Sequence, residues 1–139
     1  IIETTRLALK IFKEKNINFK FEDKIIEVNI DRTQMVRIIT NLIKNALEAC
    51  DLLENPIIQV NIKKKNKNVL IDVIDNGVGI PEEIRTKIFE PKFTTKSSGM
   101  GLGLGMVKNL VSSYGGNISF KSTINSGTSF LISFPISKR

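Results

Sequence analysis

The sequence predicts an α+β fold, a two-layer α/β sandwich in which about three helices cover one face of a mixed, mostly antiparallel sheet. Segments that alternate apolar and polar residues occur in pairs separated by short turns, which is typical of β-hairpins. Segments with apolar residues at helical spacing lie between these pairs. Neither an internal repeat nor a long linker interrupts the 139 residues, so we expect residues 1–139 to form a single domain.

The first part of the chain predicts a short helix followed by a hairpin. Residues 2–15 carry apolar side chains in a weak helical pattern. Residues 17–22 and 25–30 alternate as strands do, and Asp23-Lys24 between them is a turn signal. The expected order of the whole chain is α, ββ, α, ββ, loop, α, ββ.

A clearer helix is predicted from about residue 32 to 50. Asp31 and Gln34 have the spacing of a capping box, in which each side chain bonds the backbone of the other residue. Apolar residues then recur at helical spacing, at Met35, Ile38, Leu42, Ala46 and Ala49.

The second half of the chain predicts two further hairpins around a long loop. Strands at 58–62 and 69–74 flank a lysine-rich tip, and the second is apolar on both faces apart from one Asp, as in a central strand. The stretch from 75 to 105 is rich in turn residues, with only a short helix near 81–88, and a loop of this length is usually functional. A helix at 102–114, ended by Gly115-Gly116, and strands at 117–122 and 128–135 joined by Asn125-Ser126-Gly127 complete the pattern.

Composition excludes several classes of protein. The chain has no histidine and one cysteine, which excludes an internal disulfide, a histidine metal site and histidine-based catalysis. Its formal charge of +7 is concentrated partly at Lys63–Lys67, a run without aromatic residues that we interpret as a solvated tip and not as a nucleic-acid contact. No apolar run is long enough to span a bilayer. We expect a cytoplasmic domain, cut from a longer protein because the chain lacks an initial Met.

Asn41 and Asn45 are the first candidate binding residues. Their spacing of four places both amides one turn apart on the same side of the predicted helix, with Asn45 at the edge of the buried stripe. Two amide oxygens at such a place suit Mg²⁺, which prefers oxygen ligands. Taken alone, the two residues are better explained as ordinary boundary residues.

Two glycine-containing segments add a candidate site for a planar ring and one for an anion. Asp75 ends the central strand, where its carboxylate can accept a bond from an exocyclic amine, while Gly77 and Gly79 permit close approach of a ring on which Ile80 could pack. The run from Gly99 to Gly105 leads straight into a helix and offers backbone N–H groups to an anion. A tight turn and a flexible hinge are the respective alternatives.

A fourth segment, residues 88–96, precedes the glycine run. Phe89 and Phe93 are expected to anchor it on the core, and Lys92 and Lys96 offer point charges for phosphates. A solvated basic loop is the alternative for the lysines.

Together these segments resemble the ATP-binding domain of sensor histidine kinases, within the superfamily shared with DNA gyrase, Hsp90 and MutL. The similar motifs are the N box (41–46), the G1 box (75–80), the F box (88–96), the G2 box (99–105) and a closing hairpin with Gly127, Thr128 and Pro135. The sequences of residues 45–49 and 93–96 resemble those of the nitrogen-sensor subgroup of these kinases. Glu48 and Ala49 differ from the Lys and Tyr that many of these kinases carry, and Gly105 replaces the usual Ala or Ser.

The resemblance implies a Bergerat-type ATP-binding fold and roles for named residues. It implies that Asn45 ligates Mg²⁺ with help from Asn41, that Asp75 recognises the adenine amine, and that Lys96 reaches the γ-phosphate. The other implied nucleotide contacts are Gly77, Gly79, Ile80, Phe93, Gly99, Gly101, Leu102, Gly103, Leu104 and Thr128.

The implied function is ATP-dependent phosphorylation of a histidine in two-component signalling. Because the chain has no histidine, the acceptor is expected on a separate dimerisation domain, and the phosphate would pass from there to a response regulator. We expect the parent protein to be a homodimer, anchored in a membrane or not, and the isolated domain to be a monomer. A gyrase-like or MutL-like ATPase is less favoured, since Asn41 stands where those proteins carry a general-base Glu. A regulatory nucleotide-binding module and a serine-directed kinase of the anti-sigma-factor type are the remaining alternatives.

Overall fold

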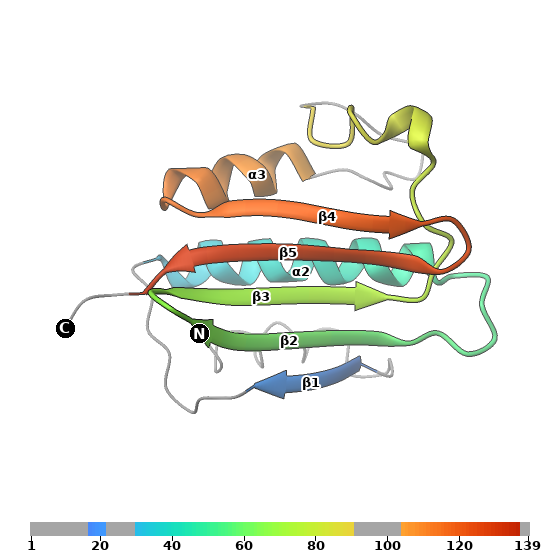
Figure 1. The fold of residues 1–139 in the computed structure, drawn as a ribbon, viewed down its shortest axis with the longest axis horizontal. Helices are drawn as coiled ribbons and strands as arrows, with labels where there is room; N and C mark the ends of the chain where they lie inside the picture. The colour runs from blue at the N-terminus through green and yellow to red at the C-terminus, as the bar shows by residue number, and fades with distance from the viewer. Residues whose placement is uncertain (1–16, 22–29, 91–103, 137–139) are drawn as a thin grey trace.

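The computed structural model describes residues 17–21, 30–90 and 104–136, the first of these as backbone only. Its sheet has five strands in the order β1-β2-β3-β5-β4 (Figure 1). β1 runs parallel to β2, and the other three pairings are antiparallel. The elements are β1 (Ile17–Phe21), α2 (Arg32–Ala49), β2 (Ile58–Lys65), β3 (Asn68–Asp75), the 3₁₀ turn η2 (Glu82–Ile84), α3 (Leu104–Ser113), β4 (Asn117–Thr123) and β5 (Gly127–Pro135).

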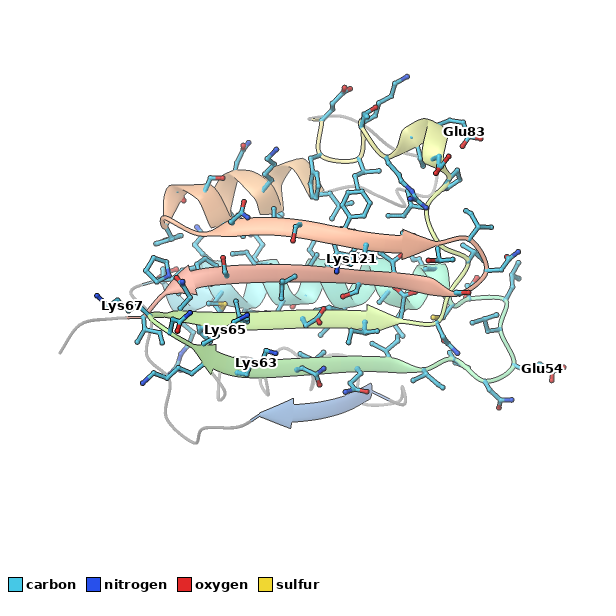
Figure 2. The ribbon with its side chains drawn as sticks, viewed as in Figure 1. Glu54, Lys63, Lys65, Lys67, Glu83 and Lys121 are labelled. Carbon is cyan, nitrogen blue, oxygen red and sulfur yellow. The ribbon has the colours of Figure 1, made fainter. Side chains whose placement is uncertain are left out.

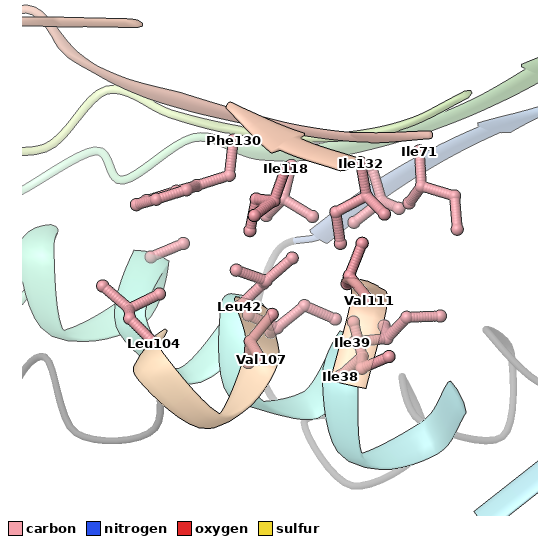
Figure 3. Close-up of a cluster of buried hydrophobic side chains, with 14 of the residues drawn as sticks. Ile38, Ile39, Leu42, Ile71, Leu104, Val107, Val111, Ile118, Phe130 and Ile132 are labelled. Carbon is pink, nitrogen blue, oxygen red and sulfur yellow. The ribbon is translucent and has the colours of Figure 1, made fainter. Parts of the chain in front are cut away.

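Helices α2 and α3 lie on one face of the sheet, which confirms the predicted two-layer architecture (Figures 1 and 3). Alternate residues of β2, β3 and β5 point into the space between the layers, as the period of two in a strand requires. Burying each of these large side chains contributes about 1.5–3 kcal/mol of hydrophobic free energy. The fully buried strand residues include Val60, Ile62, Val69, Ile71, Ile132 and Phe134.

Helix α2 supplies much of the opposing layer. It begins after Asp31, whose carboxylate accepts a 3.3 Å bond from the Gln34 backbone N–H. The capping box is only half formed, because the buried Gln34 side-chain oxygen has no partner in the described part of the chain. The helix buries a stripe at the predicted spacing that consists of Met35, Ile38, Ile39, Leu42, Ile43 and Ala46.

The lysine run extends strand β2 and does not form only its tip. Lys63, Lys64 and Lys65 are all paired with β3, and Lys65 pairs with Asn68. Pairing continues past the last buried residue because the ladder satisfies backbone groups whatever the side chain. The tight turn falls at Asn66, whose φ of 58° is accessible to Asn at low cost. The lysines are exposed, as predicted (Figure 2).

Other predicted elements differ in extent. Strand β1 confirms the strand expected at 17–22, and it pairs in parallel with β2. Most of the second strand of the predicted hairpin and the predicted helix at 2–15 fall outside the described residues, so the hairpin itself stays a prediction. The helix expected near 81–88 is a single 3₁₀ turn, Glu82–Ile84, followed by irregular turns. Helix α3 ends at Ser113, before Gly115 with its φ of +78°. No helix among the described residues is long and apolar enough to cross a membrane.

Candidate functional site

A row of polar side chains crosses the helix-facing side of the sheet where three strands meet the loops. Asp75 ends β3 and pairs with Thr128 at the start of β5, and Thr128 pairs in turn with Ser122 near the end of β4. The next helix-facing row inward is apolar, with Val73 and Phe130. The polar row therefore lies at the edge of the apolar core, between the core and the loops at this end of the sheet.

Asp75 is held with one oxygen occupied and the other available. Its Oδ1 accepts backbone bonds from Gly77 (2.8 Å) and Thr128 (3.3 Å), while no described residue bonds Oδ2. The residue is only 6% exposed. Burial raises the pKa of the Asp75 carboxyl, and the bonds from Gly77 and Thr128 oppose this rise. A buried acceptor with a free oxygen is suited to a donor from a ligand.

The loop after Asp75 is fixed to the end of α2 and to the segment between α2 and β2. Asn76 Oδ1 accepts from the Ile57 N–H at 2.7 Å, and its Nδ2 donates to the Asn55 carbonyl at 3.1 Å. A Cβ on Gly77 would lie 2.5 Å from the Ala49 carbonyl oxygen, so only glycine fits there without a shift of backbone. Sequence reasoning assigned this glycine to the approach of a ligand, and the structure adds that the protein's own packing already requires it.

The other side of the same loop is fixed to the β4–β5 turn. Gly79 has a φ of +80°, and a Cβ there would lie 2.6 Å from the Thr123 carbonyl oxygen. The Ile80 N–H donates to Ser122 Oγ at 2.8 Å, and the partly buried Ile80 packs against the core. Arg85 donates from Nε to the Ile80 carbonyl (3.0 Å) and from Nη2 to the Ser122 carbonyl (2.9 Å).

A polar stripe on α2 faces away from the centre of the core. Asn41, Asn45 and Glu48 follow each other at helical spacings of four and three, and all three are partly buried. Asn45 Nδ2 and Glu48 Oε2 are buried atoms without a hydrogen-bond partner in the described part of the chain. Because a half-turn of the Asn45 amide exchanges its nitrogen and its oxygen, the buried unpaired position at Asn45 can hold the amide oxygen instead.

This stripe fits a divalent cation. Its amide and carboxylate oxygens are ligands that Mg²⁺ accepts, and the C-terminal end of a helix favours positive charge. The last turn of α2 holds no basic residue that would compete. Residues 30–90 and 104–136 contain no group of three or more His, Cys, Asp or Glu side chains that could hold a metal, so a cation here would depend on amides, one carboxylate, water and ligand oxygens.

The remaining predicted positions are divided between the core and undescribed residues. Leu104 is 4% exposed and packs in the core, so its backbone N–H in the first turn of α3 is the part left for a ligand. Phe89 stacks edge-on with Phe120 and Phe130, confirming it as an anchor. Phe93, Lys96, Gly99, Gly101, Leu102 and Gly103 lie outside the described residues.

Sequence reasoning missed Ser122, Arg85 and the bonding role of Asn76. Ser122 lies 42 residues from Ile80 and 37 from Arg85, and neither spacing matches a local pattern. The available signal was a polar residue at a helix-facing position of a strand, which must find a partner.

Comparison with known proteins identifies the family. Residues 30–138 match the model of the histidine kinase-, DNA gyrase B- and HSP90-like ATPases. The chain belongs to this family of ATP-binding domains. Within it, the relatives include sensor histidine kinases, and the chain is similar to the catalytic domains of such kinases.

The individual similarities cover most of this chain but only part of each relative. The chain is 37% identical to sporulation kinase A of Bacillus subtilis (strain 168) over 86% of its own length and 19% of the relative's. It is 35% identical to the putative sensor histidine kinase NtrY-like of Rickettsia felis over 88% of its length and 21% of the relative's. The chain therefore spans about a fifth of these relatives.

Solved structures agree with the fold. The nucleotide-free catalytic domain of histidine kinase ThkA superposes with a TM-score of 0.84 and 34% identity, covering 97% of this chain and 91% of that one. A second structure, ThkA in complex with the response regulator protein TrrA, has a TM-score of 0.80 and 32% identity, and this chain covers 42% of it.

Proposed function

We propose that this domain binds Mg-ATP and donates the γ-phosphate to a histidine on a separate dimerisation domain, in two-component signalling. The observation that carries the proposal is the buried Asp75 carboxylate, with one oxygen satisfied by backbone and one free. The loop that follows it bonds the end of α2, the helix that carries the polar stripe with its two buried unpaired atoms. An acceptor for an exocyclic amine and a place for a hard cation are thus both at hand. Family membership and the similarity to kinase catalytic domains support the same function.

Each predicted residue takes a role in this proposal. Asp75 Oδ2 accepts from the adenine amine, and Thr128 contacts the same base. Asn45, assisted by Asn41, holds Mg²⁺, which when bound neutralises charge on the phosphates. Gly77, Gly79 and Ile80 border the base through a loop that their own packing holds rigid.

The proposed roles on the phosphate side belong to residues outside the described ranges, with Leu104 at their edge. Lys96 is proposed to reach the γ-phosphate and Phe93 to anchor the segment that carries it. Backbone N–H groups at Gly99, Gly101, Leu102, Gly103 and Leu104 are proposed to bind phosphate oxygens as a lid.

Transfer is favoured over hydrolysis for two reasons. Asn41 cannot take a proton at physiological pH, so its position offers water no general base. The chain also has no histidine to modify within itself, so its acceptor belongs elsewhere. We propose that the parent protein is a cytoplasmically exposed homodimer whose phosphate passes on to a response regulator, and that the isolated domain is a monomer.

The test uses ATP labelled at the γ-phosphate. The purified chain is mixed with the histidine-bearing helical hairpin domain of its parent protein, with Mg²⁺ or with EDTA. We expect Mg²⁺-dependent label on the hairpin domain that is lost in acid and stable in base, as for phosphohistidine. Replacing the acceptor histidine by Ala should abolish labelling. Rapid release of inorganic phosphate without the hairpin domain, or acid-stable label on a serine, would contradict the proposal.

A further inference from the structure

We infer that Ser122 sets the base specificity of the nucleotide site by fixing the direction of the Thr128 hydroxyl, with Arg85 as the positioning residue. This inference rests on the proposed function and adds two residues to it. It starts from the polar row Asp75, Thr128 and Ser122, whose members are neighbours on three adjacent strands.

The first step is to account for the one proton of Ser122. Ser122 Oγ accepts from the Ile80 N–H at 2.8 Å, which leaves its own proton to donate. Two acceptors are near, Thr128 Oγ1 at 2.9 Å and the Gly127 carbonyl at 3.3 Å. Hydroxyl bonds are normally 2.5–3.0 Å long, so the geometry favours donation to Thr128.

The second step follows the proton of Thr128. Once Thr128 Oγ1 accepts from Ser122, its own proton must point away from Ser122. No described residue accepts a bond from Thr128 Oγ1 in this direction, although the residue is only 5% exposed. Each group in this series therefore donates to the next: the Ile80 N–H donates to Ser122, and Ser122 donates to Thr128. The Thr128 hydroxyl is left as a free donor for a ligand. We call this series of hydrogen bonds the relay.

The third step compares this donor with its neighbour. Thr128 is paired with Asp75 and donates its backbone N–H to Asp75 Oδ1 at 3.3 Å, so the free donor lies beside the free acceptor Oδ2. Adenine presents an amine donor next to a ring-nitrogen acceptor, which complements this pair. Hypoxanthine presents a carbonyl acceptor next to an N–H donor, the reverse arrangement. A site that hydrogen-bonds one pattern leaves buried groups unpaired with the other.

Arg85 fixes the first hydrogen bond of the relay, the bond between Ile80 and Ser122. Its guanidinium donates to the carbonyls of both Ile80 and Ser122, the two residues joined by the first bond. The planar fork fixes these two directions together, which a lysine ammonium does not do. Loss of the fork should let the Ile80 loop move relative to β4 and weaken the relay without touching the base.

The experiment compares Mg-ATP with Mg-ITP, which differ only at this edge of the base, by calorimetric titration of the purified chain. We expect the wild type to prefer ATP by at least about tenfold. Ser122→Ala should lower the ATP-to-ITP preference about five- to tenfold, close to the value of one hydrogen bond. Ser122→Thr retains the hydroxyl and should restore most of the preference. Arg85→Lys should lower it by a smaller factor.

Two controls separate specificity from folding. Ser119→Ala changes the same residue type on the same strand, at an exposed position, and should leave the preference unchanged. In a Thr128→Val background the relay has no terminal donor, so adding Ser122→Ala should have no further effect on the preference. Should Ser122→Ala fail to fold, Ser122→Thr and Arg85→Lys still test the relay.

The outcomes distinguish the inference from the proposed function. A wild type that binds neither nucleotide overturns the proposed function and the inference with it. A wild type that binds both equally overturns base recognition at this row. A wild type that prefers ATP, with the preference unaltered in Ser122→Ala, overturns the inference alone. The same follows if the two substitutions act independently, because Ser122 then does not act through the Thr128 hydroxyl.

Discussion

The charged carboxylate of Asp75 lowers the stability of the fold and is needed for the proposed binding of a ligand. Its carboxylate is buried at the end of β3 with a raised pKa, so the folded protein disfavours the charged form that the proposed ligand contact needs. The two backbone bonds to Oδ1 only partly offset the loss of water. Residues kept at such a cost are typical of functional sites.

Asp75→Asn should separate the two consequences. An Asn oxygen can still accept from Gly77 and Thr128, but the second position becomes an N–H₂ donor that faces the adenine amine. We expect at least a tenfold loss of ATP affinity by calorimetry, with thermal stability at neutral pH equal to or above that of the wild type. Unchanged ATP affinity would count against the assignment of Asp75.

The raised pKa of Asp75 also predicts how the free energy of unfolding changes with pH. Because the folded-state pKa of Asp75 is raised, the folded state binds its proton more tightly than the unfolded state, and this group's contribution to stability falls as pH rises through that interval. The penalty is absent below the ordinary Asp pKa of about 3.9 and complete above the raised value. The stability difference between Asp75→Asn and the wild type should therefore vanish in acid and grow toward neutral pH in urea titrations.

Gly77 provides a second test at the scale of one residue. An added Cβ would lie 2.5 Å from the Ala49 carbonyl oxygen and 2.7 Å from its carbon, and both belong to backbone at the end of α2. Gly77→Ala should lower the free energy of unfolding by about 1–3 kcal/mol, because a packed backbone must move.

Gly105→Ala is the matched comparison for Gly77→Ala. Its nearest contact, the Phe89 carbonyl oxygen, is 3.0 Å away, so a milder loss is expected. Equal unfolding midpoints for the two variants in urea would contradict this reading of Gly77.

At the scale of elements, patterns within one segment were predictable and pairings between segments were not. The buried stripe of α2, the β2–β3 hairpin and the β4–β5 turn follow from local spacing. The half-formed capping box at Gln34 does not, because its orphaned oxygen depends on what surrounds the helix start.

The candidate site divides in the same way. Asp75, Thr128 and the Asn pair were predicted from motifs, whereas the bonds that join Ser122 to Arg85 and to Ile80 span 37 and 42 residues and follow from no local pattern. Leu104 shows the converse case, since a motif position turned out to place its side chain in the core.

The polar stripe of α2 allows a prediction for the metal. Asn45→Ala removes the proposed Mg²⁺ ligand, so ATP affinity should lose most of its dependence on Mg²⁺, measured by titrations in magnesium and in EDTA. Asn45→Asp keeps an oxygen and adds charge near Glu48, so metal preference, compared between Mg²⁺ and Mn²⁺, should change. Lys44→Ala is the control, because this neighbour is exposed on another side of the helix. An Asn45→Ala variant with full Mg²⁺ dependence would exclude Asn45 as a ligand.

At the scale of the molecule, the lysine run and the candidate site lie at opposite ends of the sheet (Figures 1 and 2). Lys65 pairs with Asn68 at the start of β3, and Asp75 ends the same strand seven residues on, about 23 Å away at the usual rise per residue. At 0.15 M ionic strength the screening length is about 8 Å, so these lysines contribute little at Asp75. The charge of the lysine run is therefore a property of the surface and not of the site.

Because the lysine run and Asp75 lie at opposite ends of the sheet, stabilisation of the fold by a bound nucleotide can test at which end the nucleotide binds. A nucleotide bound only by the folded state stabilises it by about 2.7 kcal/mol at a concentration one hundred times its Kd. For a domain of this size that corresponds to a rise in Tm of roughly 10 °C. We expect this rise with Mg-ATP in the wild type and in Lys63→Ala, a much smaller one in Asp75→Asn, and a reduced one when EDTA removes the metal. A loss of the rise in Lys63→Ala that matched the loss in Asp75→Asn would place the nucleotide at the other end of the sheet.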